Sequence, residues 1–439
     1  MKILHVAPVF FPEGPGGIQV HVRDLAQAQI AAGDRVSILA GSLESRPEPV
    51  LEEQRAEGLR VLRLYRDDLH HVHHARGYHA GASRLIEGAF GSERPDVIHI
   101  HSWVALSTDL VATAERLGIP TVVTLHDFLA SCPRAYRQDS SGQACLRPLG
   151  PDACGPCAPR FGFESEALVA DSLELFQSSL RAELEQARAR VLALPGIGRD
   201  LFRLAGLGDL EFEAIPLGYA PQLSGAGVAG AAAAGPVRFG TWGRLGPHKG
   251  TDLAVRGFVE ACARLPTGAA ELVVFGELAP DAYRAQVLGG SAGLPIEEFG
   301  PFDFADLQAA RLDVALFPSR CLETFGFVLD EARELGLPMV LSDLGAYGER
   351  AAGDCLVVGG DGVDGWARAI ARLVEDPTAR QRLAAAAPQA SPSPAAYARR
   401  LDETYQRAVE SPPRRAGASA PDKQRWLSLR ERYDAGLGR

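Results

Sequence analysis

The sequence predicts an α/β protein with two doubly wound parallel sheets, because β-rich apolar runs alternate with helical patterns in both halves of the chain. The runs in the first half lie at 3–7, 35–40, 59–64, 97–101 and 120–125. Helical apolar spacing fills the stretches between them, at 20–32, 83–90 and 106–117. Strands that alternate with helices of 10–15 residues indicate a parallel sheet covered by helices on both faces.

A break in composition separates the two halves. Residues 224–236 read SGAGVAGAAAAGP, and they hold no side chain large enough to build a core, so they predict a loop beside an interdomain linker. The alternation then restarts, with β-rich runs at 237–241, 272–275, 314–317, 339–342 and 355–358. We therefore expect domains at 1–218 and 219–394, followed by C-terminal helices in 395–439, of which the first packs back across the domains.

Composition and charge exclude several classes of function. The 439 residues include 45 Lys and Arg against 55 Asp and Glu, a net charge of −10, which does not suit a protein that wraps nucleic acid. The chain contains no run of about 18 apolar residues, so no membrane span is predicted. The N-terminal MKILHVAPVFF lacks a small-residue cleavage site and is interpreted as a first strand. These features predict a cytoplasmic protein.

A glycine-rich turn, Gly14-Pro15-Gly16-Gly17, follows the first predicted strand. Such a turn lets backbone N–H groups approach a phosphate or a sugar at the start of a helix. The dinucleotide pattern GxGxxG is incomplete, since position 19 is Gln. A ligand contact and a plain tight turn are therefore equal alternatives at this point.

Two cations follow the first strand of the second half. Arg244 and Lys249 lie five positions apart, and Lys249 is one of three lysines in the chain, with Lys2 and Lys423. At the end of a strand and the start of the next helix, such a pair is able to clamp a diphosphate. The alternative is a solvated pair of loop residues.

Two carboxylates, Glu323 and Glu331, flank the start of a later predicted helix. Glu323 lies in the loop after the strand at 314–317, and Glu331 lies on a helix that begins near Gly326. A carboxylate one to two turns into such a helix suits the vicinal hydroxyls of a ribose, and the helix amides favour an anion. Taken alone, the spacing is also that of carboxylates that face water.

Four of the seven cysteines cluster in a Pro- and Gly-rich segment. They are Cys132, Cys145, Cys154 and Cys157. The CxxC pair with two further cysteines favours a structural zinc held by four thiolates. Disulfides, an iron–sulfur cluster and free thiols remain alternatives.

The histidines form two groups. His99 and His101 end one strand, and His101 is either an acceptor-side residue or a structural hydrogen-bonding residue. The second group is interpreted as a mobile or solvated loop, or as an acceptor contact, rather than as a metal site; its members are His70, His71, His73, His74 and His79.

Several motifs occur together in a characteristic order. They are Gly16-Gly17 with His21-Val22, Thr124-Leu125-His126, Gly243-Arg244-Leu245 with Lys249-Gly250, and Glu323-x-Phe325-Gly326-x4-Glu331-Ala332. Over residues 1–409 the chain resembles the retaining, nucleotide-sugar-dependent glycosyltransferases of family 4, which have the GT-B fold of two Rossmann-like domains. The chain departs from the family pattern at Leu217 and Ala220, where Asn and Asp are usual.

The resemblance implies a role for each matching residue. Arg244 and Lys249 would bind the donor diphosphate, and Glu331 would bind the ribose. Glu323 would contact the donor sugar, and His126 would lie beside the reacting sugar. Other residues would line the donor or the acceptor side: Gly16, Gly17 and the backbone amides of Phe325, Gly326 and Phe327 on the donor, and His101 and Asp127 toward the acceptor.

The resemblance also implies the substrates. We expect a nucleotide sugar as co-substrate, with UDP favoured, and a carbohydrate, lipid-linked or small-molecule acceptor. An Arg/Lys clamp replaces a divalent metal, so we expect no catalytic metal. The alternatives are a nucleotide-sugar epimerase of the same architecture and a non-catalytic nucleotide-sugar binder.

Overall fold

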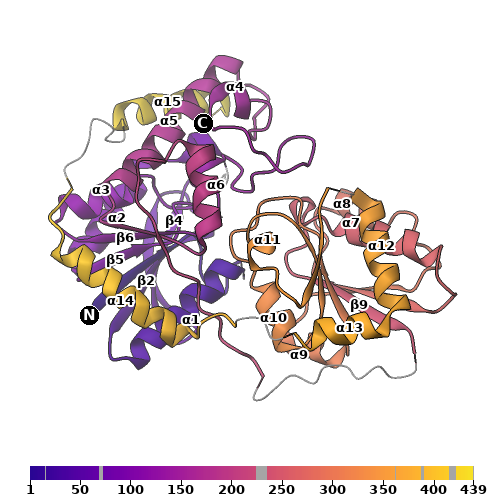
Figure 1. Cartoon of the computed structure of the whole chain (residues 1–439). Helices are drawn as coiled ribbons and strands as arrows, with labels where there is room; N and C mark the ends of the chain where they lie inside the picture. Colours follow the sequence, from indigo (N-terminus) through magenta and orange to yellow (C-terminus); the bar gives the residue numbers. More distant parts are fainter. Residues whose placement is uncertain are drawn as a thin grey trace. The chain divides into compact units, whose positions relative to one another are not determined.

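The computed structural model divides into two compact α/β units. It describes residues 1–14, 16–68, 73–223, 235–360, 362–386, 390–414 and 422–438, apart from the side chain of Arg76. The first unit comprises residues 1–140, 146–219 and 392–439, and the second comprises 141–145 and 220–391 (Figure 1). Each unit holds one predominantly parallel sheet with helices packed on it, which confirms the predicted fold class.

The first unit is built on an eight-stranded sheet of order β3-β4-β2-β1-β5-β6-β7-β8. The strands are β1 (Lys2–Ala7), β2 (Arg35–Ser45), β3 (Val50–Ala56), β4 (Leu59–Arg66), β5 (Val97–Ile100), β6 (Thr121–Leu125), β7 (Ala189–Leu192) and β8 (Glu213–Ala214). All neighbours are parallel except β3, which pairs antiparallel with β4 at the edge of the sheet. Strand β3 was not predicted from the sequence because its segment, VLEEQRA, is half-exposed and rich in charge.

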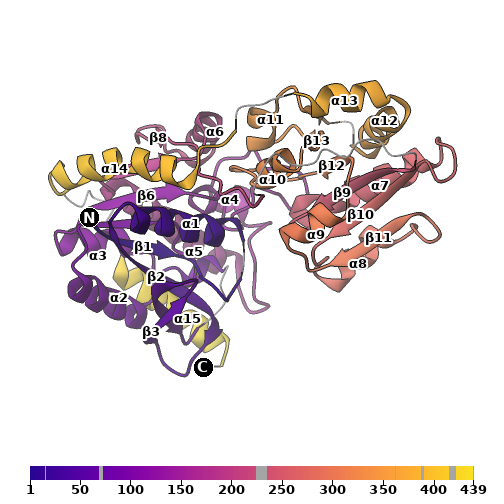
Figure 2. The same ribbon diagram turned by 90° about the horizontal axis from the view of Figure 1, so that it is seen from below.

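Helices from both ends of the chain cover this sheet. They are α1 (Gly17–Ala31), α2 (Ala80–Glu93), α3 (Leu110–Arg116), α4 (Pro151–Cys154), α5 (Glu166–Gln186), α6 (Pro195–Ala205), α14 (Pro394–Glu410) and α15 (Lys423–Gly436), with short 3-10 turns η1 (His74–Arg76) and η2 (Leu129–Ser131). Helix α14 lies alongside α1 (Figure 2). Helix α15 packs against α5, with Trp426 buried and its indole Nε1 donating to Ser179 Oγ at 2.8 Å.

The second unit has a six-stranded, fully parallel sheet of order β11-β10-β9-β12-β13-β14. Its strands are β9 (Val237–Trp242), β10 (Ala270–Phe275), β11 (Ile296–Gly300), β12 (Val314–Phe317), β13 (Met339–Ser342) and β14 (Cys355–Val358). Its helices are η3 (Pro247–Lys249), α7 (Thr251–Cys262), α8 (Asp281–Leu288), α9 (Phe304–Ala309), α10 (Val328–Glu334), α11 (Ala346–Arg350), α12 (Gly362–Glu375) and α13 (Pro377–Ala384).

Both faces of the second sheet are buried, as a parallel sheet requires. Phe239, Phe258 and Trp366 belong to the core on one face, where α7 and α12 pack. Trp242 and Phe317 belong to the core on the other face and meet edge to face, with ring centroids 4.7 Å apart. Among the described helices of the whole chain, none is both long enough and apolar enough to cross a membrane.

Each sheet has one point where the strand order reverses on either side of its first strand. In the first unit this switch point lies between β1 and β5, and in the second unit it lies between β9 and β12. In open parallel sheets, ligands bind beyond the carboxyl ends of the strands at such a point. A ligand site is therefore expected at the loops after β1, β5 and β6 in the first unit, and at those after β9 and β12 in the second.

Candidate functional site

An ion pair joins the two loops at the switch point of the second unit. Lys249 ends η3, in the connection after β9, and Glu323 lies in the loop after β12. The Lys249 ammonium donates to both carboxylate oxygens of Glu323, at 2.8 and 2.9 Å. Ser319 Oγ donates a third hydrogen bond to Glu323, at 2.8 Å. Two residues that the sequence analysis chose independently are thus in direct contact.

The Glu323 carboxylate stays ionised although it is buried. Burial pushes its pKa up, but the charge and hydrogen bonds of Lys249 and the Ser319 hydroxyl outweigh burial, so the pKa lies below its usual value. The neighbouring Cys321 thiol behaves in the opposite way. Burial, followed by the Glu323 charge, raises its pKa to about 12, so this thiol stays protonated at neutral pH.

Arg244, the other predicted cation, is in a different state from Lys249. Its side chain is exposed on the loop directly after β9. It makes no hydrogen bond and no ion pair with any residue in the described part of the chain. One cation of the predicted pair is therefore neutralised by a buried carboxylate, and the other is available to an anion from solution.

Glu331, the second predicted carboxylate, lies on α10 and is held by an indole. Trp242 Nε1, at the end of β9, donates to Glu331 Oε2 at 2.7 Å. Burial raises the pKa of Glu331 to about 7, although the hydrogen bond from Trp242 opposes the rise. At neutral pH this carboxyl is therefore poised between its two protonation states.

The segment Phe325-Gly326-Phe327 forms the connection into α10, which begins at Val328. Gly326 has φ +77°, and a Cβ on it would come within 2.5 Å of the Tyr347 ring, so only glycine fits without a shift. Arg350 holds the segment in place. Its guanidinium lies over the Phe325 ring at 4.1 Å and donates to the carbonyls of Phe325 and Gly326 at 3.0 and 3.1 Å.

The glycine-rich turn of the first unit leads into α1. Gly14, with φ +56°, is the residue in the left-handed region, whereas Gly16 is extended and Gly17 is the first helical residue. A Cβ on Gly16 would meet the side-chain amide oxygen Oε1 of Gln19 at 3.0 Å. Gln19, the residue that breaks the dinucleotide pattern, thus lies against the predicted donor-side glycine.

His126 and His101 are in direct contact in the first unit. Each follows a strand immediately, β6 and β5 respectively, and both are buried. His101 Nδ1 and His126 Nε2 are 2.8 Å apart. The other ring nitrogen of His101 faces His5 Nδ1 at 3.0 Å, so His101 is engaged by protein groups on both sides.

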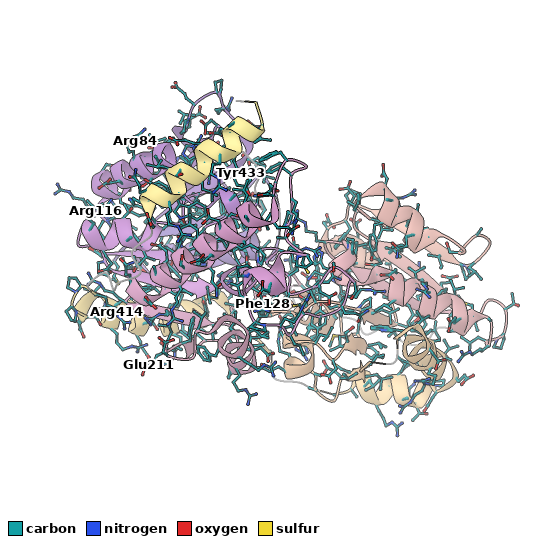
Figure 3. The ribbon with its side chains drawn as sticks, turned by 90° about the horizontal axis from the view of Figure 1, so that it is seen from above. Arg84, Arg116, Phe128, Glu211, Arg414 and Tyr433 are labelled. Carbon is teal, nitrogen blue, oxygen red and sulfur yellow. The ribbon has the colours of Figure 1, made fainter. Side chains whose placement is uncertain are left out.

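Asp127 lies two residues before the short turn η2. Its Oδ1 accepts a hydrogen bond from the Leu129 backbone N–H at 2.8 Å. Burial raises the pKa of Asp127 to about 6, with the Leu129 N–H opposing the rise. Phe128, labelled in Figure 3, follows directly and is fully buried, so the backbone here is anchored by packing.

The second histidine group is buried where it is described, so its interpretation as a solvated loop is wrong for these members. His70 and His71 lie outside the described residues. His79 caps α2 by accepting from the Ala82 N–H at 3.0 Å, and its other nitrogen contacts Asp67 at 2.6 Å. His73 and His74 stack on each other beside η1, with ring centroids 4.4 Å apart.

The helix α15 closes over this histidine pair. The His73 ring lies 5.5 Å from the ring of Tyr433, which is a residue of α15 and is labelled in Figure 3. The Tyr433 hydroxyl donates to Glu164, a carboxylate that also lies 3.4 Å from His73 Nε2. A C-terminal helix supplies the burial that the local sequence did not show.

The four clustered cysteines form no disulfide in the structure. Where described His, Cys, Asp and Glu side chains gather closely enough to share an ion, the groups hold only histidines and carboxylates, without a cysteine. Cys157 Sγ instead accepts from Arg147 at 3.6 Å. The geometry lends the structural zinc no support, and it stays a prediction that metal analysis decides.

Several residues that shape these sites were missed in the sequence. They are Trp242 and Arg350 in the second unit, and His5, Gln29 and Tyr405 around the histidines of the first. Tyr405 contacts His99, which lies 306 positions away in the sequence, and no local pattern predicts such a contact. Trp242 had one signal, since it directly precedes the Gly243-Arg244 motif.

Two protein-family models match the chain. The model described as Glycosyltransferase Family 4 matches residues 15–148, and that described as Glycosyl transferases group 1 matches residues 236–376. The first range covers Gly16, Gly17 and His126, and the second covers Arg244 through Glu331.

Known proteins show the same likeness along most of the chain. The D-inositol 3-phosphate glycosyltransferase of Rhodococcus erythropolis is 26% identical, over 88% of this chain and 85% of that protein. The glycogen synthase of Mycobacterium tuberculosis is 28% identical, over 89% and 90%. The solved structure of Anabaena HepE with UDP and glucose superimposes with a TM-score of 0.60 at 16% identity, over 92% and 99%.

Proposed function

Since the chain belongs to the family 4 and group 1 glycosyltransferases of GT-B fold, we propose that it moves a sugar from a UDP-sugar to an acceptor hydroxyl with retention of configuration. The contact between Lys249 and Glu323 carries this proposal. It brings a cation and an ionised carboxylate together at the switch point of the second sheet, where a nucleotide sugar would present its diphosphate beside its sugar.

The two cations would act on the leaving group. When the bond between the sugar and the diphosphate breaks, negative charge grows on the diphosphate oxygens. Lys249 and the exposed Arg244 are positioned on one loop to meet this charge, and preorganised cations stabilise a transition state most where charge develops. This clamp performs the task that a divalent metal performs in other sugar transferases.

The two carboxylates would orient the donor. Glu323 stays ionised, so its oxygens are able to accept hydrogen bonds from hydroxyls of the transferred sugar. Glu331, held by Trp242, would accept from the two ribose hydroxyls. The loop that contains Phe325 and Gly326 is fixed by Arg350, so its backbone amides would meet the diphosphate without further ordering.

The base would lie near the ends of β10 and β11. Phe299, on β11, is exposed, and its ring packs on Phe275 with centroids 4.9 Å apart, which offers a flat surface beside backbone groups. Uridine is favoured because the Anabaena protein of the same fold is described in complex with UDP and glucose. The acceptor is proposed to be a carbohydrate or polyol, in line with the inositol phosphate and glycogen named for the relatives.

Release of nucleoside diphosphate tests the proposal. The purified chain is incubated with UDP-, GDP- and ADP-sugars, each with and without a panel of sugar, sugar-phosphate, inositol-phosphate and glucan acceptors. We expect UDP release only when donor and acceptor are both present, and NMR of the product should show the anomeric configuration of the donor.

Each of the other possible outcomes would contradict a different part of the proposed function. Conversion of the donor sugar without an acceptor would indicate an epimerase instead. Binding of UDP-sugar without turnover on any acceptor would indicate a binding protein. Release of GDP or ADP alone would contradict the choice of base, and an inverted product would contradict retention.

A further inference from the structure

Trp242 is held at the end of β9 by the core of the second unit. Its side chain is 3% exposed, and its indole meets the Phe317 ring of β12 edge to face, with centroids 4.7 Å apart. A ring packed in this way does not turn freely, so its Nε1 keeps the direction in which it donates to Glu331 Oε2 at 2.7 Å. All three residues belong to the second unit.

The indole is the one hydrogen-bond donor to the Glu331 side chain in the described part of the chain. Burial raises the pKa of this carboxyl, the indole opposes the rise, and the charges of Asp330 and Glu334 on the same helix add to it. The Tyr347 hydroxyl of α11 also interacts with Glu331, and it stays protonated because burial raises its pKa well above the usual value. The titratable groups around Glu331 are therefore acidic or neutral.

The arginines of α10 and α11 already have carboxylate partners. Arg333 of α10 pairs with Asp354 at 2.8 Å, and Arg350 of α11 pairs with Asp330 at 2.7 Å. Glu331 therefore relies on a neutral donor, the indole, to stabilise its charge.

The neutral donor makes Glu331 differ from Glu323. The Lys249 ammonium keeps Glu323 ionised at neutral pH. The indole contributes a dipole and no net charge, so the pKa of Glu331 remains raised to about 7. Around neutral pH, Glu331 therefore exchanges a proton with the solvent, whereas Glu323 does not.

The two oxygens of Glu331 are not equivalent. An indole N–H donates and never accepts, so Oε2 has to act as an acceptor toward Trp242. An oxygen that already accepts a hydrogen bond is the less basic of the two, so a proton prefers Oε1. An ionised Oε1 accepts a hydrogen bond from a ligand hydroxyl, whereas a protonated Oε1 donates one. Glu331 is only partly buried, so a ligand is able to reach it.

We propose that Trp242 is a positioning residue for Glu331: its indole holds Oε2, so that a proton and a ribose hydroxyl of the donor compete for Oε1. The ribose contact rests on the proposed function, whereas the proton equilibrium of Glu331 follows from contacts within the second unit. The chain therefore binds its nucleotide sugar with release of a proton near neutral pH, and the indole determines the pH range of this release.

The indole N–H signals of the full chain, labelled with 15N-tryptophan, test the proton equilibrium without any substrate. The chain has four tryptophans, and single substitutions by Phe assign their signals. The Trp242 signal should shift with a midpoint near pH 7, and it should not shift in Glu331→Gln. The Trp426 signal is an internal control, because its indole donates to the Ser179 hydroxyl, which does not titrate. A Trp242 signal that is constant between pH 5.5 and 8.5 would overturn the inference.

The affinity for UDP-glucose, measured by calorimetry without acceptor, tests the competition for Oε1. UDP-glucose is the probe because its diphosphate, unlike that of UDP, has no proton to lose between pH 6 and 8.5. In the wild-type chain the Kd should fall about tenfold from pH 6 to pH 8, as Glu331 loses its proton. In Glu331→Gln this step in Kd should be absent.

Trp242→Phe then tests the role of the indole. It removes the N–H but keeps an aromatic ring in the core, so the midpoint of the Kd profile should rise by about one pH unit. The Kd should then be about fivefold higher at pH 7 and within about twofold of the wild type at pH 8.5. Trp103→Phe is the matched control, since Trp103 also donates to a buried carboxylate, Glu183 at 3.0 Å, but in the first unit. Its Kd and its midpoint should stay as in the wild type.

The outcomes separate this inference from the proposed function. An unchanged midpoint in Trp242→Phe overturns the role of the indole. A Trp242 signal that titrates with Glu331, together with a Kd that does not change with pH, overturns the competition for Oε1. Failure to bind any UDP-, GDP- or ADP-sugar contradicts the proposed function, and the indole signal then still confirms or overturns the proton equilibrium of Glu331.

Discussion

In the second unit, the carboxyl ends of β9 and β12 form a charged edge of the sheet, where ionised side chains lie. In the first unit, the carboxyl ends of β1, β5 and β6 form an edge where neutral imidazole rings lie. Lys249 and Glu323 form a charged pair at the first of these places. His5, His101 and His126 form a neutral chain at the second, where burial holds their pKa values far below the usual range. The strands beneath both edges are parallel and reverse their order in the same way.

The contrast follows from what burial does to charge. A buried ion costs several kcal/mol unless a partner offsets the loss of water, so Glu323 keeps its charge only with Lys249 and Ser319 beside it. A histidine without such a partner loses its proton instead. One type of scaffold thus supports two kinds of buried polar group: an ion pair at the second sheet, which we propose meets a leaving diphosphate, and hydrogen-bonded neutral imidazoles at the first.

Removal of Lys249 should produce the largest loss. In Lys249→Ala, turnover at saturating donor should fall by about 100- to 1,000-fold, because one charge-assisted contact to a leaving group is worth about 2.7–4 kcal/mol of barrier. The same assay on Arg284→Ala provides the control, since Arg284 is an exposed cation of the same unit paired with Glu298. Wild-type turnover in Lys249→Ala would remove the charged edge from the chemistry.

Substitution of Gly326 should test how much the backbone at the charged edge depends on a glycine at this position. In Gly326→Ala the new methyl group meets the Tyr347 ring at φ +77°, and we expect a loss of about 2 kcal/mol in unfolding free energy, read from denaturant titration. Gly290→Ala shares a positive φ of +83° but meets no atom within 4 Å. Equal losses in the two variants would show that the contact with Tyr347 does not matter.

Glu331 should couple pH to both binding and stability. In Glu331→Gln the KM for the donor should rise about tenfold at pH 8, because a ribose contact acts equally in the ground state and the transition state. In the wild-type chain the KM should rise as the pH falls through 7, where the carboxylate takes up its proton.

The same substitution, Glu331→Gln, should raise the stability of the protein at alkaline pH although it weakens donor binding. Burial raises the pKa of Glu331 from 4.5 to about 7, so the native carboxyl holds a proton that the unfolded chain has lost between these values. The contribution of this carboxyl to stability is present below pH 4.5 and is lost as the pH rises through 7. Thermal melts should therefore show Glu331→Gln more stable than the wild type at pH 8, and not at pH 4.5.

The smallest effect should come from a hydrogen bond of His99, which lies beside the neutral chain. Thr124→Val removes the hydroxyl that lies 2.7 Å from His99 Nε2 in a fully buried place, so the free energy of unfolding should fall by about 1 kcal/mol. The affinity for UDP should not change, since the charged edge lies in the other unit. A loss of UDP affinity would contradict the division of roles between the two units.

The site residues of the charged edge were easier to predict from the sequence than those of the neutral edge. The motifs around Arg244, Lys249, Glu323 and Glu331 were visible because Arg244 and Lys249 follow the buried strand β9, and Glu323 and Glu331 follow the buried strand β12. Parallel strands place their carboxyl ends at one edge of the sheet, so local patterns were enough to predict these residues as candidates for one site. The predicted strands also sufficed for the α/β class, whereas β3 and β11 were missed because their residues are only partly buried.

The neutral chain could not be found in this way. His99, His101 and His126 were visible as residues, but their state depends on Gln29 from α1 and on Tyr405 from α14, which is 376 positions away from Gln29. Whether a histidine is charged, and which nitrogen carries its hydrogen, depends on burial and on the partner of each atom. Both are properties of packing between distant segments, so the sequence by itself determined the scaffold and the charged motifs, and only the tertiary structure decided the protonation and direction of the buried histidines.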